Sequence, residues 1–147
     1  MKKLFAILTC LFVLATFTAT AQSSAEDNRI SPNFPSFKGV LLIHTTTTKS
    51  VTKILEKRFS KFYKGEFEIV EGDDINSGSY NNAKTYPFVV SYDHTQHIGN
   101  TDYYRFTMTD RTTGIKYLTA NGADNTIPNF ALINLYAKAL EKFRNKE

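Results

Sequence analysis

The sequence contains a single cysteine, Cys10, and no tryptophan. Cys10 lies in an apolar N-terminal run that we expect to be removed on export. The exported chain can then form no disulfide, no thiolate metal site, no cysteine nucleophile and no covalent c-type haem link. A secreted domain without disulfides depends on its hydrophobic core alone, and the 9 phenylalanines and 8 tyrosines that follow residue 21 can supply one.

The N-terminus has the three parts of a secretory signal peptide. A basic start is followed by an apolar run from Leu4 to about Phe17 and by an Ala-Thr-Ala site that ends at Ala21. The run is about 14 residues long, whereas a membrane-spanning helix needs roughly 20. The cysteine lies inside the run and not directly after it, which argues against a lipid anchor. We therefore expect cleavage between Ala21 and Gln22 and a secreted or periplasmic protein.

The exported chain has little net charge and no second long apolar run. Removal of residues 1–21 leaves 126 of the 147 residues, enough for one domain with its own core. The net charge falls from +4 to +2, because Lys2 and Lys3 leave with the signal. So small an excess does not predict nucleic-acid binding, which usually needs a concentrated basic patch. We also expect no transmembrane segment after removal of the signal.

The rest of the chain reads as a lead-in followed by one domain. Residues 22–37 are polar, carry two prolines and show no periodicity, so we expect a flexible lead-in outside the core. Residues 38–147 form a single α+β domain. Strands are predicted at 39–44, 66–72, 86–94, 101–110 and 115–120, and helices at 50–64 and from about Pro128.

The order β-α-β-β-β-α predicts the fold class. A strand, a helix and a strand in succession favour one parallel crossover. The segment DRTTG (110–114) favours an antiparallel hairpin with Gly114 in a left-handed conformation. We therefore predict an α+β two-layer sandwich, with a mixed, mostly antiparallel sheet and both helices on one face.

Four consecutive threonines join the first strand to the first helix, in LLIHTTTTKS (41–50). A phosphate-binding loop needs glycines so that backbone N–H groups can approach the anion, and no glycine lies between Gly39 and Gly65. We expect Thr48 or Ser50 to cap the helix. A weak anion site at Thr48, Lys49 and Ser50 is the alternative.

Three histidines, His44, His94 and His97, are the candidate metal ligands, with Asp93 beside the second. If the strand at 86–94 runs antiparallel to the first strand, His44 and His94 lie at opposite ends of the sheet, roughly 15–20 Å apart. We therefore expect no metal site. This separation would not hold if the two strands were parallel.

No other pattern predicts catalysis or a cofactor. Asp73 and Asp74 carry oxygen ligands suited to calcium, but the spacing of an EF-hand loop is absent. No G-x-S-x-G motif occurs, and turn chemistry accounts for Asp110. We predict no catalytic, metal or cofactor residues, and a hydrolase is the least favoured class.

Tyrosines recur in the strand segments and offer a candidate binding face. Their large amphipathic rings are frequent at interfaces. On the sheet side without helices, such a face would contain Tyr86, Tyr92, Tyr103, Tyr104 and Tyr117. Ordinary packing within the sheet is the alternative.

The segment YRFTMTDRTTGIKYLTANG, followed by a closing helix, resembles small envelope domains of Gram-negative bacteria. In these a strand ends in D-x-x-T-G-K, a second strand returns and a C-terminal helix covers the sheet. Asp110, Thr113, Gly114 and Lys116 match, with one residue interposed before the lysine. The group includes periplasmic lipoproteins and is similar in shape to lipoprotein activators of penicillin-binding proteins, although this chain lacks their lipobox. The signal resembles those of Bacteroidetes exported proteins.

The resemblance implies a non-catalytic envelope domain and carries no residue-level function. We therefore expect the chain to bind another envelope or secreted protein, through strand edges or the tyrosine face. A small-ligand or glycan-binding module that uses the 72–85 loop is the alternative. The sequence leaves the oligomeric state open.

Overall fold

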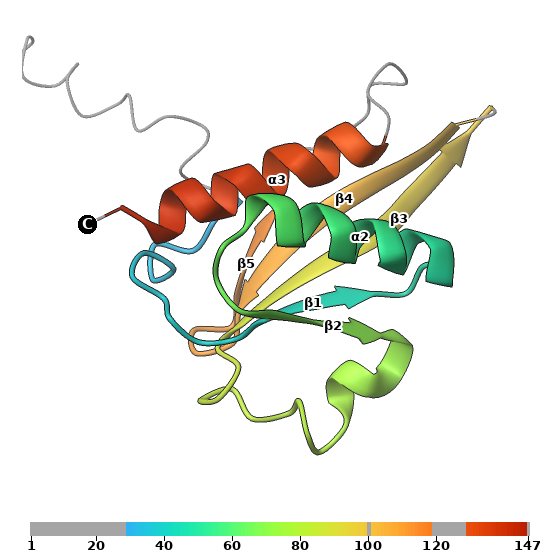
Figure 1. Ribbon diagram of the computed structural model, residues 1–147. Coiled ribbons are helices and arrows are strands. Elements are labelled where there is room, and N and C mark those ends of the chain that lie inside the picture. The colour runs from blue at the N-terminus through green and yellow to red at the C-terminus, as the bar shows by residue number, and fades with distance from the viewer. Residues whose placement is uncertain (1–28, 100, 119–128, 147) are drawn as a thin grey trace, which may run out of the picture.

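The computed structural model describes residues 29–99, 101–118 and 129–146, so the expected signal peptide and Pro128 lie outside it. One face of a five-stranded sheet is covered by two helices, as Figure 1 shows. The elements are β1 (Leu41–Thr45), α2 (Lys49–Phe62), β2 (Phe67–Glu71), the 3₁₀ helix η2 (Gly72–Asn76), β3 (Phe88–Ile98), β4 (Thr101–Asp110), β5 (Ile115–Leu118) and α3 (Asn129–Arg144). None of the helices in these ranges is long and apolar enough to cross a membrane.

The sheet has the strand order β2-β1-β3-β4-β5. β1 pairs in parallel with β2 and with β3, whereas β3, β4 and β5 pair antiparallel. The antiparallel part contains the longest strands, β3 and β4, with 11 and 10 residues. The predicted α+β sandwich, its element order and its mixed sheet are therefore confirmed.

The condition for the expected separation of His44 and His94 is not met, because β3 runs parallel to β1. The segment between β2 and β3 is long enough to return the chain to the end of the sheet at which β1 begins. A parallel pair needs such a crossover, whereas an antiparallel pair can be joined by a short hairpin. As a result, the carboxyl end of β1 lies beside the interior of β3, where Thr45 pairs with Tyr92.

The main core lies between the sheet and the two helices. β1 is buried on both faces, as its continuous apolar run predicts, and Leu41, Leu42 and Ile43 are all inaccessible to solvent. Leu41 and Ile43 face the helices, and Leu42 faces the opposite side. The helices contribute Leu55 and Phe59 from α2 and Ile133, Tyr136, Ala137, Leu140 and Phe143 from α3.

The second face of the sheet is partly covered by the segment between β2 and β3. Ile75, Tyr80 and Tyr86 pack against a small cluster of Leu42, Val70 and Val89. The guanidinium of Arg111 holds this segment, since its Nη1 donates to the carbonyl oxygen of Tyr80 at 2.6 Å and to that of Tyr86 at 3.4 Å. The polar 72–85 loop is thus tied to the sheet over part of its length.

The described part of the expected lead-in, residues 29–37, packs into the core, which corrects the expectation of a flexible segment there. Ile30 and Phe34 are fully buried, and the ring of Phe34 lies 5.3 Å from that of Phe88 and 5.6 Å from that of Phe37. Ser36 adopts a positive φ of 64°, and its N–H donates to the carbonyl oxygen of Arg144 at 3.1 Å. A short turn-rich segment can bury two side chains without any periodicity, so its sequence pattern did not show this.

The buried carboxylate of Asp110 joins this segment to the β4–β5 hairpin. Oδ2 accepts hydrogen bonds from Ser31 Oγ and Asn33 Nδ2, each at 2.9 Å. Oδ1 accepts from the N–H and the hydroxyl of Thr112, at 3.0 and 2.6 Å. Gly114 has a φ of 74°, so the predicted left-handed turn residue is confirmed.

Candidate functional site

The threonine loop begins where β1 ends and leads directly into α2. Thr48 occupies the N-cap position, and its carbonyl oxygen accepts from the N–H groups of Val51 and Thr52 at 2.9 and 3.1 Å. Its side chain makes no capping bond; the hydroxyl lies 2.8 Å from Ser50 Oγ instead. The predicted position of the cap is confirmed, but the predicted side-chain bond is wrong, because the two hydroxyls bond to each other.

A hollow of about 300 Å³ lies between this loop and the end of the β3–β4 hairpin. Thr46, Thr47, Thr48 and Val51 line one side, and His94 and Tyr104 line the other. The hollow lies beyond the carboxyl end of β1 and beside the interior of β3, since His94 belongs to that strand. The carboxyl end of a parallel strand is a common ligand position in open α/β sheets. We take this threonine–histidine hollow as the candidate functional site.

The expected anion site is only partly placed in the hollow. Thr48 lines it, but Lys49 and Ser50 do not, and both are exposed. The hydroxyl of Thr45, which precedes the hollow, lies 2.7 Å from that of Thr47. The lining therefore offers hydroxyl groups, an imidazole and a phenol ring, a set suited to an uncharged polar ligand more than to an anion.

His94 belongs to a small exposed cluster with His97 and Asp102. His94 Nε2 lies 3.0 Å and His97 Nδ1 lies 2.7 Å from the same oxygen, Asp102 Oδ1. Hydrogen bonds from His97 and His94 lower the pKa of the Asp102 carboxyl below its ordinary value. The side chains of the three residues are 43% to 59% exposed, so the cluster is open to solvent.

Sequence reasoning placed Asp93 beside the histidines and missed Asp102. A hairpin turn at Gly99, which has a φ of 62°, brings Asp102 opposite His97 in the β3–β4 register. A signal for this turn was present, because a Gly-Asn pair between two strand patterns favours a two-residue hairpin.

His44 is not part of the cluster of His94, His97 and Asp102, although β3 is parallel to β1. It pairs with Ser91 on the second face of the sheet, where its Nε2 is 2.8 Å from the carbonyl oxygen of Gly72. Val51 and Tyr104, which line the hollow, pack on the helix side instead. Within the described ranges, no group of three or more His, Cys, Asp or Glu side chains could hold a metal ion. Asp73 and Asp74 are exposed on η2.

The five tyrosines do not form one exposed face. Tyr92, Tyr104 and Tyr117 pack with the helix-side core, and Tyr92 is buried. Tyr86 packs in the cluster on the second face, and Tyr103, on the alternate side of β4 from Tyr104, is also buried. The alternation of side chains along β3 and β4 places the tyrosines on both faces of the sheet. The structure therefore supports the alternative of ordinary packing within the sheet.

Instead, stacked aromatic rings connect the hollow to the core. Tyr104 stacks on Tyr92 at 5.1 Å and 6°, Tyr92 lies 4.8 Å from Phe106, and Phe106 stacks on Tyr136 at 4.3 Å and 5°. Burial raises the pKa of Tyr104 and, further, that of Tyr92, so both phenols stay protonated at neutral pH. The Tyr104 part of the wall is therefore an uncharged aromatic surface that is backed by the buried ring of Tyr92.

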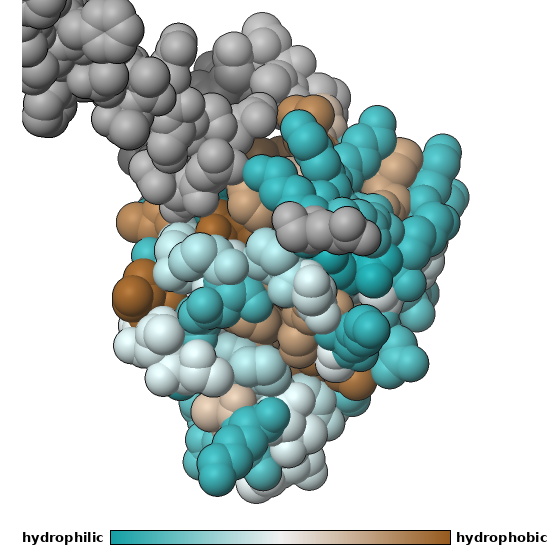
Figure 2. Space-filling model, turned by 90° about the vertical axis from the view of Figure 1, so that its left-hand side faces the viewer, coloured by the Kyte–Doolittle hydropathy of each residue, from teal (hydrophilic) through white to brown (hydrophobic). Residues whose placement is uncertain are grey.

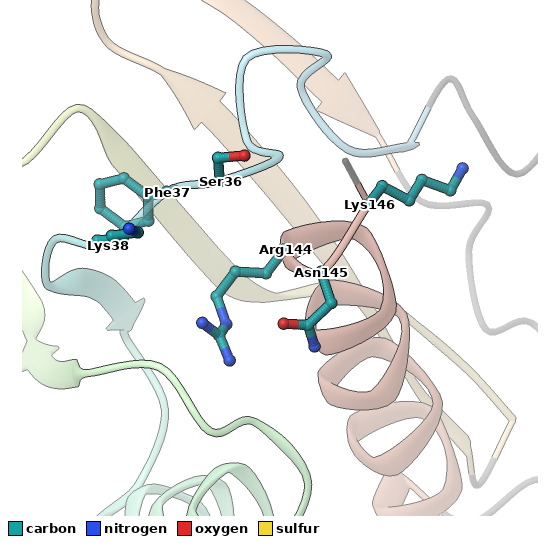
Figure 3. A pocket seen from close by; sticks show the side chains of 6 residues that line it. All are labelled: Ser36, Phe37, Lys38, Arg144, Asn145 and Lys146. Carbon is teal, nitrogen blue, oxygen red and sulfur yellow. The ribbon is translucent and has the colours of Figure 1, made fainter.

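A second hollow, of about 270 Å³, lies where the lead-in meets the end of α3 (Figure 3). It is lined by Ser36, Phe37, Lys38, Arg144, Asn145 and Lys146. The Arg144 guanidinium is bound to Glu141, with Nη2 2.8 Å from Oε1, and the Lys146 side chain points away from the other lining residues (Figure 3). The positive charge of this second hollow is thus partly neutralised by Glu141, and we regard the hollow as the weaker candidate site.

Comparison with known proteins adds little to these observations. No protein-family model matches the chain, and no curated protein matches its sequence. Among solved structures, the chain is similar to TolB from Acinetobacter baumannii, with a TM-score of 0.45 and 14% sequence identity. The match covers 72% of this chain but 28% of the TolB chain. A likeness at this level supports no conclusion about function, and the resemblance to activator lipoproteins stays a prediction.

Proposed function

We propose that the chain is an exported domain that acts by binding another envelope or secreted protein, and not by catalysis. The signal-peptide pattern of residues 1–21 supports the export, and the edge strand β5 supports the binding. An exposed sheet edge carries backbone groups that an extended segment of a partner can pair with.

The two edges of the sheet differ in a way that favours β5. The β2 edge carries exposed Glu68 and Glu71, and charges of this kind protect an edge against pairing. On β5, Ile115 and Leu118 are 52% and 53% exposed. In the described part of the chain, no strand pairs with the outer side of β5. β5 carries one exposed charge, Lys116, where β2 carries two, and this accessible, more apolar edge is the observation that carries the proposal.

The test is crosslinking and affinity capture of the tagged protein from its own cells. We expect the double variant Ile115→Ser/Leu118→Ser to lose a partner that the wild type captures. The control is Ile98→Ser, which removes a similarly exposed apolar side chain outside β5. The proposal fails if the wild type captures no partner, or if the control variant loses it as completely as the β5 double variant does.

A small uncharged ligand is the second candidate function, and the threonine–histidine hollow favours it. The 72–85 loop is a poorer candidate than expected, because Tyr80 and Tyr86 pack on the sheet. A library of neutral sugars and amides can be screened by NMR, with the resonances of His94 and Tyr104 as reporters. Chemical-shift changes confined to residues 72–85 would place the ligand site in that loop. The absence of any shift change would rule out the small-ligand function.

A further inference from the structure

A row of lysines follows the exposed side of α2. Lys49, Lys53, Lys57 and Lys61 are spaced one helical turn apart, and all four are exposed. Like charges at this spacing repel each other and weaken a helix. The only carboxylate of α2 is that of Glu56. The helix therefore maintains a concentrated positive charge that its own stability does not require.

α3 continues the same surface. Leu135, Lys138 and Lys142 share the exposed side of this helix, and Leu135 is 60% exposed. The two rows meet at Phe62, whose ring centroid lies 5.3 Å from Lys61 Nζ and 4.8 Å from Lys138 Nζ. We call these six lysines, at 49, 53, 57, 61, 138 and 142, together with Leu135, the lysine face.

The positive charge of the protein is segregated in the helical layer. α2 carries five cationic side chains and one carboxylate, and α3 carries three and one, so the two helices have a net charge of +6. The whole chain has only +4. Acidic residues are concentrated elsewhere, and the segment 66–74 alone contains five carboxylates and no basic residue. Figure 1 places its η2 part at the end of the molecule away from α3.

In Figure 2, strongly hydrophilic side chains gather on the right of the view, and apolar side chains are scattered among polar ones elsewhere on this face. From the sequence, the small net charge predicted no nucleic-acid binding and gave no indication of a concentrated basic patch. The two-layer fold produces one, because it places both basic helices on the same side of the sheet.

We propose that the lysine face docks on the surface of a membrane that contains anionic phospholipids. Clusters of four to eight lysines or arginines are the pattern by which proteins bind such surfaces. Lysine carries a compact charge on a flexible stem, which suits many mobile headgroups, whereas arginine forms fixed bidentate pairs. Leu135 adds an exposed apolar side chain among the lysines, as in helices that lie in a membrane interface. Six exposed lysines on two packed helices suit an extended anionic surface, and not one small anion in a pocket.

The test is vesicle binding by the chain without residues 1–21, compared on phosphatidylcholine and on phosphatidylcholine mixed with phosphatidylglycerol. Binding should require the anionic lipid and should weaken as salt is raised. Each lysine near the surface should contribute about fivefold in affinity, so Lys53→Gln/Lys57→Gln/Lys61→Gln should lose on the order of a hundredfold. The matched control, Lys38→Gln/Lys84→Gln/Lys116→Gln, removes the same charge outside the lysine face and should bind nearly as well as the wild type.

A fluorescent reporter tests the orientation independently. The chain has no tryptophan, so Leu135→Trp introduces a single one on the lysine face. Its emission should shift to the blue when anionic vesicles are added, and Ile98→Trp should not shift. The proposal is overturned if neutral vesicles bind equally, if both triple variants lose the same affinity, or if the protein binds DNA or poly-glutamate but no vesicle. None of these results depends on β5, so this proposal and the proposed protein binding can fail separately.

Discussion

Replacement of Asp110 by asparagine should destabilise the fold in a way that depends on pH. The carboxylate is fully buried and accepts hydrogen bonds from the lead-in and from the β4–β5 hairpin. Asparagine preserves the shape and one acceptor oxygen. It places an NH₂ group where Ser31 and Asn33 now donate to Oδ2, and it removes the charge.

The magnitude follows from the pKa of the carboxyl. Burial by itself raises the pKa of Asp110, but hydrogen bonds from Thr112, Asn33 and Ser31 outweigh burial and lower it from 3.8 to about 2. A shift of this size corresponds to about 2 kcal/mol of folding free energy. Because the folded-state pKa is the lower one, this stabilisation is present above about pH 4 and is lost as the pH falls towards about 2.

Urea unfolding followed by circular dichroism would measure the effect. At about pH 7, Asp110→Asn should lower the free energy of unfolding by about 2 kcal/mol, and the difference should shrink below about pH 4. Glu141 has a pKa of about 2 and titrates in the same range, but it does so in both proteins and cancels in the comparison. A difference that stays constant with pH, or one under about 0.5 kcal/mol at neutral pH, would refute the reasoning.

Three further predictions concern packing and turns. Phe34→Ala should lower the free energy of unfolding in urea by about 3–5 kcal/mol, because its ring is fully buried. Phe37→Ala should lower it clearly less, because that ring is half-buried. Equal and small losses for the two variants would show that the lead-in is flexible. Tyr136→Phe should leave the free energy of unfolding unchanged or raise it by up to about 1 kcal/mol, since the buried hydroxyl has no hydrogen-bond partner among the described residues. A decrease of more than about 1 kcal/mol would indicate that the hydroxyl has a partner. Gly114→Ala should lower the melting temperature by an amount equivalent to about 1 kcal/mol, because its φ is 74°, and Gly78→Ala, where φ is not positive, should have little effect.

Local patterns predicted most of the secondary structure. The apolar run of β1, the helical spacing in α2 and the Asp110–Gly114 turn each depend on residues close in sequence. The candidate site could not be assembled in this way. Asp102 reaches His94 and His97 through the β3–β4 register, and Tyr104 meets the threonine loop only because β3 lies beside β1. Both depend on strand pairing, which sequence periodicity does not specify.

The sequence by itself determined the expected export, the absence of disulfide chemistry after signal removal and the order of strands and helices. These follow from composition and from patterns within single segments. Only the tertiary structure decided the direction of β3, the burial of Ile30 and Phe34, and the separation of the tyrosines between two faces. It also decided that a chain of small net charge has a strongly basic face, because net charge is a sum over residues, whereas a binding surface depends on which of them the fold places together.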